Sequence, residues 1–202
     1  MIIPGVVLAA GRSTRMGRPK ALLPAGPAGE TFVGRIVRTL RAGGVDDVVV
    51  VAAGVAEEIG RVLAREEPPP RVVINPDPGR GQFSSLQVGL RTVSRPGVGG
   101  VLVTLVDVPL VSAGTVERLL AVHRRTGAPI VRPERQGRHG HPVIFDRTLF
   151  SAIGAAPARS SAKAIIAAHR RESVSVPVAE DGPFRDIDTP AEYARAFDRR
   201  PR

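Results

Sequence analysis

Apolar residues along the chain fall into short continuous runs that alternate with stretches of helical spacing. Residues 48–53 are a run of valine and alanine, which is typical of a strand buried on both faces. Residues 31–42 place Phe32, Ile36 and Leu40 on one helical face and are followed by two glycines, a common helix end. We predict further strands at residues 6–9, 72–74, 101–106, 130–131, 143–145 and 174–178, and further helices at residues 56–67, 84–93, 112–125, 160–170 and 190–197.

The order of these elements indicates the class of fold. Strands that alternate with helices form β-α-β units, which build a mostly parallel sheet with helices on both faces. Ligands of such sheets bind beyond the carboxyl ends of the strands. A chain of 202 residues with 43% hydrophobic content supports one core and is short for two full domains, and no repeat or long linker divides it. We therefore predict a single domain over residues 1–202.

The composition excludes several classes of protein. Cysteine is absent, which excludes a disulfide framework and cysteine-based metal sites. The first five residues lack the basic start and the cleavage site of a secretory signal. The longest apolar runs have about six residues, far fewer than a membrane span needs. We expect a cytoplasmic protein that does not enter a membrane.

The formal net charge of +10 suits nucleic acid, a membrane surface or an anionic small substrate. An arginine-rich genome composition explains the same number, because the arginines are spread along the chain. Aromatic residues make up only 3%, too few for stacking on bases, so we do not expect nucleic-acid binding. Only two of the 29 basic residues are lysines. The compact charge of Lys20 suits a phosphate oxygen, whereas Lys163 lies in a predicted helix and is typical of a surface residue.

A glycine-rich loop follows the first predicted strand and carries the sequence LAAGRSTRMGRPK from Leu8 to Lys20. Its two glycines and the serine between them allow tight backbone turns, so that amide groups can face an anion. Arg15 and Lys20 add two charged donors, and the combination fits a triphosphate. The spacing of the glycines excludes both a Walker A loop and the Rossmann G-x-G-x-x-G motif. A glycine-rich loop with solvated arginines is the alternative interpretation.

An acidic residue ends the fourth predicted strand. Asp107 is followed by Pro109, which ends the strand, so the carboxyl edge of the sheet places Asp107 opposite the glycine-rich loop. A carboxylate there suits Mg²⁺, which binds one or two carboxylates together with phosphate oxygens. Asp186 and Asp188 alternate along an extended segment, so only one of them can face the site. We expect Asp188 on the metal side and Asp186 at the cap of the helix that begins at Pro190.

Several segments resemble a known family. The loop resembles the nucleotidyltransferase signature L-A-A-G-x-S-x-R-M-G-x-x-K, and four further segments resemble family blocks in the same order. Nearly the whole chain is similar to the MobA-like nucleotidyltransferase superfamily, specifically to its molybdenum cofactor cytidylyltransferase (MocA-like) branch. The resemblance implies an α/β, Rossmann-like (GT-A-like) three-layer α/β/α sandwich whose N-terminal part binds nucleotide, while residues from about 100 to 202 complete the metal and acceptor sites. The four segments are Asn75 with residues 81–90, residues 106–109 (VDVP), residues 140–145 (GHPVIF) and residues 186–193 (DIDTPAEY).

The resemblance also assigns residues to roles. Arg15, Lys20 and Asp107 are the expected catalytic residues. Asp107 and Asp188 are the expected ligands of Mg²⁺ or Mn²⁺, and His141 is expected at the acceptor pocket rather than as a base. Ser84 and Ser85 lie at a predicted helix start, where hydroxyls commonly act as N-caps. His141 lies between Gly140 and Pro142, which indicate a fixed turn. Structural roles are therefore the alternatives for these three residues. The implied nucleotide-binding residues are Leu8, Ala9, Ala10, Gly11, Arg12, Ser13, Asn75, Gly81, Ser84 and Ser85.

The implied reaction transfers CMP from CTP to a phosphorylated acceptor, with molybdopterin as the leading acceptor and pyrophosphate as a product. The acceptor phosphate attacks the α-phosphorus in line, so no covalent enzyme intermediate is needed, and because that phosphate is already ionised near pH 7 no general base is needed either. A molybdoenzyme is the expected receiver of the product. Ala10 resembles the cytidine-using branch, since guanylyl enzymes tend to have glycine there. The alternatives are GTP or another nucleotide, a different acceptor such as a sugar phosphate, and a non-catalytic nucleotide-binding accessory protein for molybdoenzyme maturation.

One segment departs from the family pattern. Members of the molybdopterin type often carry G-D-x-G-x-R before the last strands, and the matching residues 154–161 lack the acidic residue. Arg159 is the candidate for the arginine of that segment. This departure bears on the identity of the acceptor more than on the transfer of the nucleotide.

Overall fold

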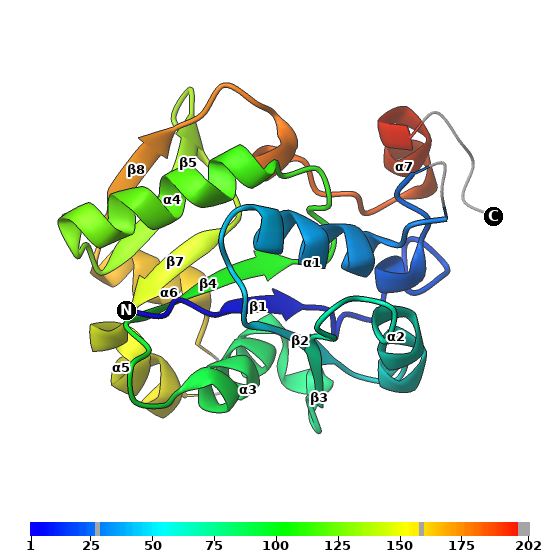
Figure 1. Ribbon diagram of the computed structural model, residues 1–202, viewed down its shortest axis with the longest axis horizontal. Helices are drawn as coiled ribbons and strands as arrows, with labels where there is room; N and C mark the ends of the chain where they lie inside the picture. The colour runs from blue at the N-terminus through cyan, green and yellow to red at the C-terminus, as the bar shows by residue number, and fades with distance from the viewer. Residues whose placement is uncertain (27–28, 158–159, 198–202) are drawn as a thin grey trace.

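In the computed structural model, which describes residues 1–26, 29–157 and 160–197, eight strands form one mixed sheet. They are β1 (Gly5–Leu8), β2 (Val48–Ala52), β3 (Arg71–Ile74), β4 (Gly100–Leu105), β5 (Ile130–Arg135), β6 (Arg138–His139), β7 (Val143–Asp146) and β8 (Val174–Pro177). Their order is β3-β2-β1-β4-β7-β5-β6, with β8 paired to β5 (Figure 1). The half of the sheet from β3 to β4 is parallel, whereas β7 runs antiparallel to both β4 and β5.

Helices cover both faces of this sheet in the part of the chain that the structure describes (Figure 1). One layer contains α1, α2, α4 and α7, and the other contains α3, α5 and α6. No helix among the described residues is long and apolar enough to cross a membrane. The helices are α1 (Phe32–Ala42), α2 (Ala56–Leu63), α3 (Gln82–Val93), α4 (Ala113–Thr126), α5 (Phe150–Ala155), α6 (Ala162–Ala168) and α7 (Pro190–Phe197).

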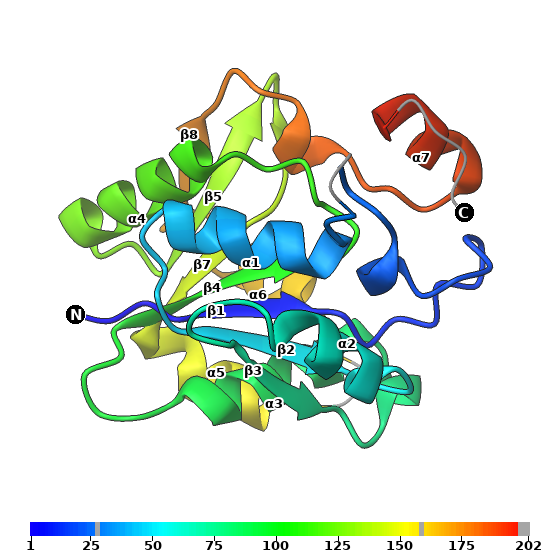
Figure 2. The same ribbon diagram turned by 45° about the vertical axis from the view of Figure 1, so that its right-hand side comes forward.

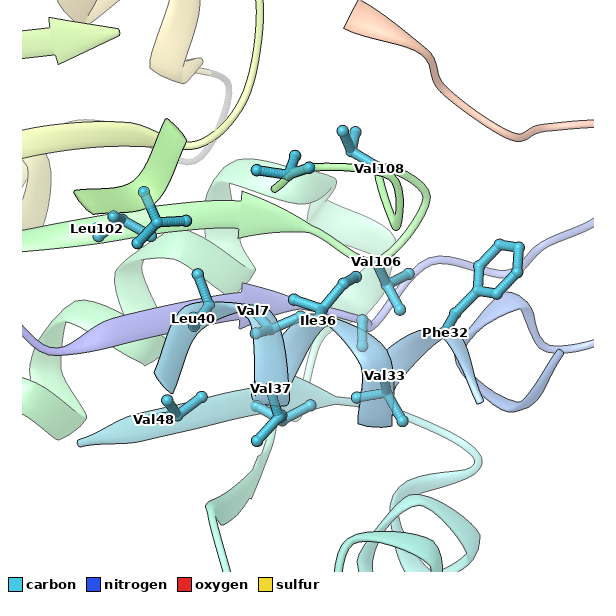
Figure 3. Packing of buried hydrophobic residues seen from close by; sticks show 14 of the residues in the cluster. Val7, Phe32, Val33, Ile36, Val37, Leu40, Val48, Leu102, Val106 and Val108 are labelled. Carbon is cyan, nitrogen blue, oxygen red and sulfur yellow. The ribbon is translucent and has the colours of Figure 1, made fainter. Parts of the chain in front are cut away.

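The central strands are buried on both faces because their side chains point alternately into two cores. Val7 packs with Ile36 and Leu40 of α1 in one core (Figure 3). The preceding residue, Val6, packs with Leu86 of α3 in the other core. All residues of β1 and β2 are buried. The continuous β-branched runs in the sequence therefore correspond to the centre of the sandwich.

The register between β1 and β4 positions the candidate site. Leu8 at the end of β1 lies beside Leu105 at the end of β4. Because the two strands are parallel, the glycine-rich loop and Asp107 leave the sheet at the same edge. The backbone amide of Ile187 donates a hydrogen bond to the carbonyl oxygen of Asp107 at 2.8 Å, which brings the segment before α7 to this edge as well.

Helix α7 is anchored beside α1 and the chain that follows the glycine-rich loop, as both ribbon views show (Figures 1 and 2). The Tyr193 hydroxyl donates a hydrogen bond to the carbonyl oxygen of Pro24 at 2.7 Å. The Tyr193 ring stacks on Phe32, with 6.0 Å between the ring centroids, and also contacts Phe197. These contacts fix the extended segment that precedes α7 next to the site.

The expectation that Asp186 caps α7 is wrong. Glu192 accepts hydrogen bonds through Oε2 from the backbone amides of Thr189 and Asp188, both at 2.9 Å. The Thr189 hydroxyl accepts one from the backbone amide of Glu192 at 3.3 Å. This reciprocal arrangement is a capping box, in which a Thr and a Glu three residues later satisfy the first amides of a helix. The first turn of α7 therefore has its cap without Asp186.

Most predicted elements lie within a few residues of their expected positions, and two short ones were not predicted. Helix α2 ends at Leu63, earlier than the predicted 67, and α6 is shorter than the predicted 160–170. Helix α5 has six residues, of which only Phe150 and Ile153 are buried, too few for a periodic signal. Strand β6 has two residues. The mostly parallel α/β sheet is confirmed, and its antiparallel part was not foreseen.

Candidate active site

The loop after β1 holds its shape through its own backbone. Ser13 has a φ of 51° and Gly17 a φ of 73°, both in the left-handed region that glycine adopts readily and serine rarely. The carbonyl oxygen of Ser13 accepts hydrogen bonds from the backbone amides of Met16 (3.0 Å) and Gly17 (3.1 Å). The Ser13 hydroxyl accepts another from the backbone amide of Lys20 (3.0 Å). The loop therefore closes on itself and presents Lys20 from a defined position.

Charged side chains from distant parts of the chain meet around Lys20. Its Nζ donates a hydrogen bond to Asp107 Oδ2 at 3.1 Å and another to Asp188 Oδ1. Arg15 Nη2 donates to the second oxygen of Asp188 at 2.5 Å. The hydrogen bond from Lys20 is the main reason that the pKa of Asp188 is lowered, and Arg15 adds to the effect. Asp188 is therefore a carboxylate at neutral pH.

Asp107 has one oxygen that no hydrogen bond satisfies. Its Oδ1 is buried without a partner, while Oδ2 faces Lys20. A buried carboxylate oxygen is unfavourable unless a donor or a cation meets it. Asp107 and Asp188 already share one ammonium group, so their oxygens surround a position that suits positive charge. A hard divalent cation that takes one or two carboxylates plus phosphate oxygens fits this donor set.

The remaining acidic side chain near this position is Asp186. Partial burial, followed by the charges of Asp107 and Asp188, raises its pKa, and the charge of Lys20 opposes this shift. Asp186 therefore adds negative charge to a cluster that already holds two carboxylates. Within the described residues no group of three or more His, Cys, Asp or Glu side chains is arranged as a metal site. Phosphate oxygens of a bound nucleotide would have to complete the coordination of a cation here.

A cavity of about 440 Å³, which we call the first cavity, lies between the glycine-rich loop and the start of α3. Lys20 and Asp107 line it together with Gln82 of α3. Gly81 has a φ of 88°, so the chain turns into α3 through a conformation that other residues rarely adopt. The volume is in the range of small-molecule sites. Among the residues expected to bind nucleotide, those that line the first cavity are Leu8, Ala10, Gly11, Arg12, Ser13, Gly81 and Ser85.

Three other residues expected to bind nucleotide lie behind this wall. Asn75 is buried and its Nδ2 donates hydrogen bonds to the hydroxyls of Ser84 (2.8 Å) and Ser85 (2.9 Å). The Ser84 hydroxyl donates to the carbonyl oxygen of Gly81 at 2.8 Å. Ala9 packs in the hydrophobic core. Asn75 and Ser84 therefore hold the turn at Gly81 and the hydroxyl of Ser85 in place, which differs from the direct contact expected for them.

A second cavity of about 340 Å³ adjoins the first, and Leu8, Gln82 and Leu105 line both. His141 lines the second cavity, and its Nδ1 is buried without a hydrogen-bond partner. Burial lowers the pKa of His141, against the opposing effects of the Val103 backbone and of Asp107, so the ring is neutral at pH 7. The structure thus places His141 in the adjoining cavity, where the charge of Asp107 still acts on it, and not among the residues that contact Lys20.

Sequence reasoning missed several residues that line these cavities. Gln82 lines both and had a usable signal, because it is the polar residue at the start of α3 directly after Gly81. Arg132 and His139 line the second cavity as well. Arg132 lies on β5, of which only residues 130–131 were predicted, and His139 lies on β6, which was not predicted. Lys163 also lines the second cavity, although its position on a short helix had indicated an ordinary surface residue.

The segment that departs from the family pattern lies beside α3. Gln87 Nε2 donates hydrogen bonds to the carbonyl oxygens of Ile153 (2.9 Å) and Ala156 (3.0 Å). Ser161 caps α6 by accepting a hydrogen bond from the backbone amide of Ala164 (3.1 Å). Arg159 lies outside the residues that the structure describes. The described part of the segment therefore has a structural role.

Two curated proteins are similar to this chain in sequence. The chain is 37% identical to the nicotine blue oxidoreductase of Paenarthrobacter nicotinovorans, in an alignment of 158 residues that covers 75% of this chain and 74% of the relative. It is 30% identical to a probable molybdenum cofactor guanylyltransferase of Rhodopirellula baltica, in an alignment of 200 residues that covers 96% of this chain and 91% of the relative.

Solved structures share the whole fold. Rv0371c from Mycobacterium tuberculosis H37Rv superimposes with a TM-score of 0.85 and 31% identity over 98% of both chains. The same protein in complex with manganese gives a TM-score of 0.76 at 29% identity, over 98% of this chain and 99% of the other. Residues 5–174 match the MobA-like NTP transferase domain, a span that contains the glycine-rich loop, Asp107 and both cavities. This chain therefore belongs to the family of MobA-like NTP transferases.

Proposed function

We propose that this nucleotidyltransferase transfers CMP from CTP to the phosphate of molybdopterin and releases pyrophosphate for each turnover. The observation that carries the proposal is the meeting of Lys20, Asp107 and Asp188 beside a cavity lined by the glycine-rich loop. Phosphoryl transfer chemistry depends mainly on positioning and charge neutralisation, and this site offers both. A molybdoenzyme is the proposed receiver of the product.

The transfer is a single in-line displacement. An oxygen of the acceptor phosphate forms a bond to the α-phosphorus of CTP while the bond between that phosphorus and the oxygen bridging to the β-phosphate breaks. Lys20 and Arg15 neutralise charge on the leaving pyrophosphate, and the amides of the loop bind its oxygens. An acceptor phosphate is largely ionised near pH 7, since its second pKa is about 6. The neutral ring of His141 is therefore not required as a base.

Asp107 and Asp188 are the residues proposed to hold a divalent cation, Mg²⁺ or Mn²⁺. When bound, such an ion neutralises negative charge on the phosphates and orients them. The unsatisfied Asp107 Oδ1 and the shared contact with Lys20 support this assignment. Manganese in the structure of the Rv0371c relative is a finding on that protein, and it agrees with the proposal.

The preference for CTP is proposed from the wall of the first cavity. Ala10 adds a methyl group where the guanylyl branch tends to have glycine, and Gln82 and Ser85 offer amide and hydroxyl groups to a base edge. A smaller pyrimidine fits beside that methyl group, and each polar group left unpaired by the wrong base costs about 1–3 kcal/mol. GTP is the second candidate, favoured by the relative named a probable molybdenum cofactor guanylyltransferase.

A comparison of nucleotides with molybdopterin as acceptor tests the proposal. Two mispaired groups correspond to at least about 10²-fold discrimination, so we expect kcat/KM for CTP to exceed that for GTP by this factor. Equal use of both nucleotides, or a preference for GTP, contradicts the cytidylyl assignment and retains nucleotidyl transfer. Absence of pyrophosphate with all four nucleotides supports the accessory-protein alternative. Sugar phosphates in place of molybdopterin test the alternative acceptors. A redox assay, suggested by the name of the Paenarthrobacter relative, tests for oxidoreductase activity.

A further inference from the structure

The second cavity has mostly apolar walls. Leu8, Phe83 and Leu86 line it on the α3 side, and Val103, Val143 and Phe145 line it from the sheet. Ligand groups that need many hydrogen bonds would be left unpaired against such walls, at a cost of about 1–3 kcal/mol each. These walls therefore suit the faces of a flat aromatic ring better than a body rich in hydroxyl groups.

Basic side chains line the same cavity from three different elements. Arg132 extends from β5, His139 from β6 and Lys163 from α6. No acidic residue is among the residues that line the cavity in the described part of the chain. The second cavity therefore differs from the first cavity, where Asp107 lies among the lining residues together with the basic residues Arg12 and Lys20.

Arg132 has a guanidinium group that the protein does not satisfy. Its Nε is buried without a hydrogen-bond partner, and among the described residues neither Arg132 nor Lys163 forms an ion pair. Burial and the neighbouring Arg170 lower the pKa of Arg132. The acidic group that faces His139 is Glu134, whose Oε1 accepts a hydrogen bond from the backbone amide of Gly137 at 2.5 Å. A partly buried and unpaired guanidinium is unfavourable until an anion binds to it.

We propose that Arg132 and Lys163 form an anion site in the second cavity that binds a second negatively charged group of the acceptor. This inference rests on the proposed function, in which the reacting phosphate lies at Lys20 and Asp107. Those two residues line the first cavity, and neither Arg132 nor Lys163 lines it. One phosphate cannot occupy both places, so the acceptor carries two anionic groups joined by an apolar or aromatic body. Simple sugar phosphates lack both the second charge and the apolar body.

Binding of 6-carboxypterin, a fluorescent aromatic carboxylate, tests the anion site without turnover. Its neutral parent pterin is the matched ligand control. We expect the wild-type protein to bind 6-carboxypterin more tightly than pterin. Lys163→Gln and Arg132→Gln should each weaken 6-carboxypterin binding by about tenfold or more, the scale of a charge-assisted hydrogen bond, and should leave pterin binding unchanged. Lys163→Arg should restore it.

Arg125→Gln is the matched protein control, because Arg125 is exposed on α4, in the other helix layer. Lys163 is exposed, so its replacement leaves the fold intact. Equal binding of 6-carboxypterin and pterin, or equal loss in the Arg125 control, overturns the inference. CTP binding and pyrophosphate release are measured on the same variants. CMP transfer without a charge-dependent 6-carboxypterin site contradicts this inference alone, whereas a charge-dependent site without any transfer contradicts the proposed function.

Discussion

At the scale of single residues, Lys20 is the centre of the site. It is buried, its amide is tied to Ser13, and its ammonium group contacts two carboxylates. A bound nucleotide would offer phosphate oxygens to Lys20. A bound divalent cation would take the place of the ammonium group beside the two carboxylates. We therefore expect Lys20 to exchange its aspartate partners for phosphate oxygens when the substrate binds.

Removal of the charged donors should lower turnover. Lys20→Ala and Arg15→Ala are each expected to reduce kcat by about 10²-fold or more, because a preorganised charge is lost from the transition state. Arg18→Ala is the control, since Arg18 is exposed in the same loop and forms no ion pair among the described residues. Pyrophosphate release gives the rates. Near-native release by Lys20→Ala would mean that the loop does not bind the phosphates.

The two carboxylates should differ in their effect on metal binding. Asp107→Asn keeps the shape of the side chain and removes its charge, so we expect a large loss of activity and of Mn²⁺ affinity in the presence of CTP. Asp188→Asn should cause a smaller loss of the same kind, because Asp107 remains. Electron paramagnetic resonance of free Mn²⁺ measures the affinity. Unchanged Mn²⁺ binding by both variants is incompatible with the assignment.

Neutralising Asp186 should stabilise the protein. A carboxyl whose pKa is raised on folding loses stability as the pH rises above its ordinary pKa of about 3.9, so its charge opposes folding at pH 7. Asp186→Asn removes that charge and its repulsion by Asp107 and Asp188. We expect a gain below about 1 kcal/mol in the free energy of unfolding, because the residue keeps its contact with water. Urea unfolding at pH 7 is the measurement, and a clear loss would support a structural role instead.

At the scale of elements, α3 links the core to both cavities. Gly89 faces the sheet, and a Cβ built there would lie 2.4 Å from Val6 Cγ1 and 3.1 Å from Val51 Cγ2. Gln82 at the other end of the helix lines both cavities. The close approach of α3 to β1 therefore sets the position of residues that face the ligands.

Gly89 and Gly60, which both lie in helices, should respond in opposite ways to alanine. Gly89→Ala must displace α3 or Val6 and should destabilise the protein by about 1–3 kcal/mol. Gly60 in α2 has open space around its Cβ position, so Gly60→Ala should stabilise by about 0.5–1 kcal/mol. Urea unfolding measures both. The packing account fails if Gly89→Ala is as stable as the wild type.

The parallel half of the sheet could be predicted because its signals are local. Continuous valine runs mark strands buried on both faces, and Ser112 and Thr31 mark helix starts through side chains that accept hydrogen bonds from Thr115 and Gly34. The antiparallel half depends on the insertion of β7 between β4 and β5, an order that no single segment of the sequence encodes. The second cavity is lined by α3 and β4 as well as by this half and α6, and its basic residues Arg132, His139 and Lys163 could not be predicted from motifs.

At the scale of the whole molecule, the positive charge is spread along the chain rather than gathered in one segment. The net charge of +10 comes mainly from dispersed arginines, many of which form surface pairs such as Arg71 and Arg95 with Asp47. These pairs lower the pKa of Asp47 against the opposing effect of burial. We propose that the positive charge relevant to function lies in the glycine-rich loop and in the wall of the second cavity.

The candidate site could be predicted in part, for a physical reason. Arg15, Lys20 and Asp107 follow strands that end at one edge, so alternation of elements was sufficient to bring them near each other. The role of Asn75 and Ser84 in supporting the turn depends on side-chain hydrogen bonds that a motif does not specify. Arg132 and Lys163 have no local signal, because only the cavity relates them.

Transfer of a labelled nucleotide is the most direct test of nucleotidyl transfer at this site. CTP labelled at the α-phosphorus, and in parallel at the γ-phosphorus, is incubated with the protein, Mg²⁺ and molybdopterin. The account predicts that the α label appears in the acceptor and the γ label in pyrophosphate, in equal amounts, and that Lys20→Ala suppresses both. Release of the γ label as free phosphate, or an α label that stays in CTP or CMP, would contradict it.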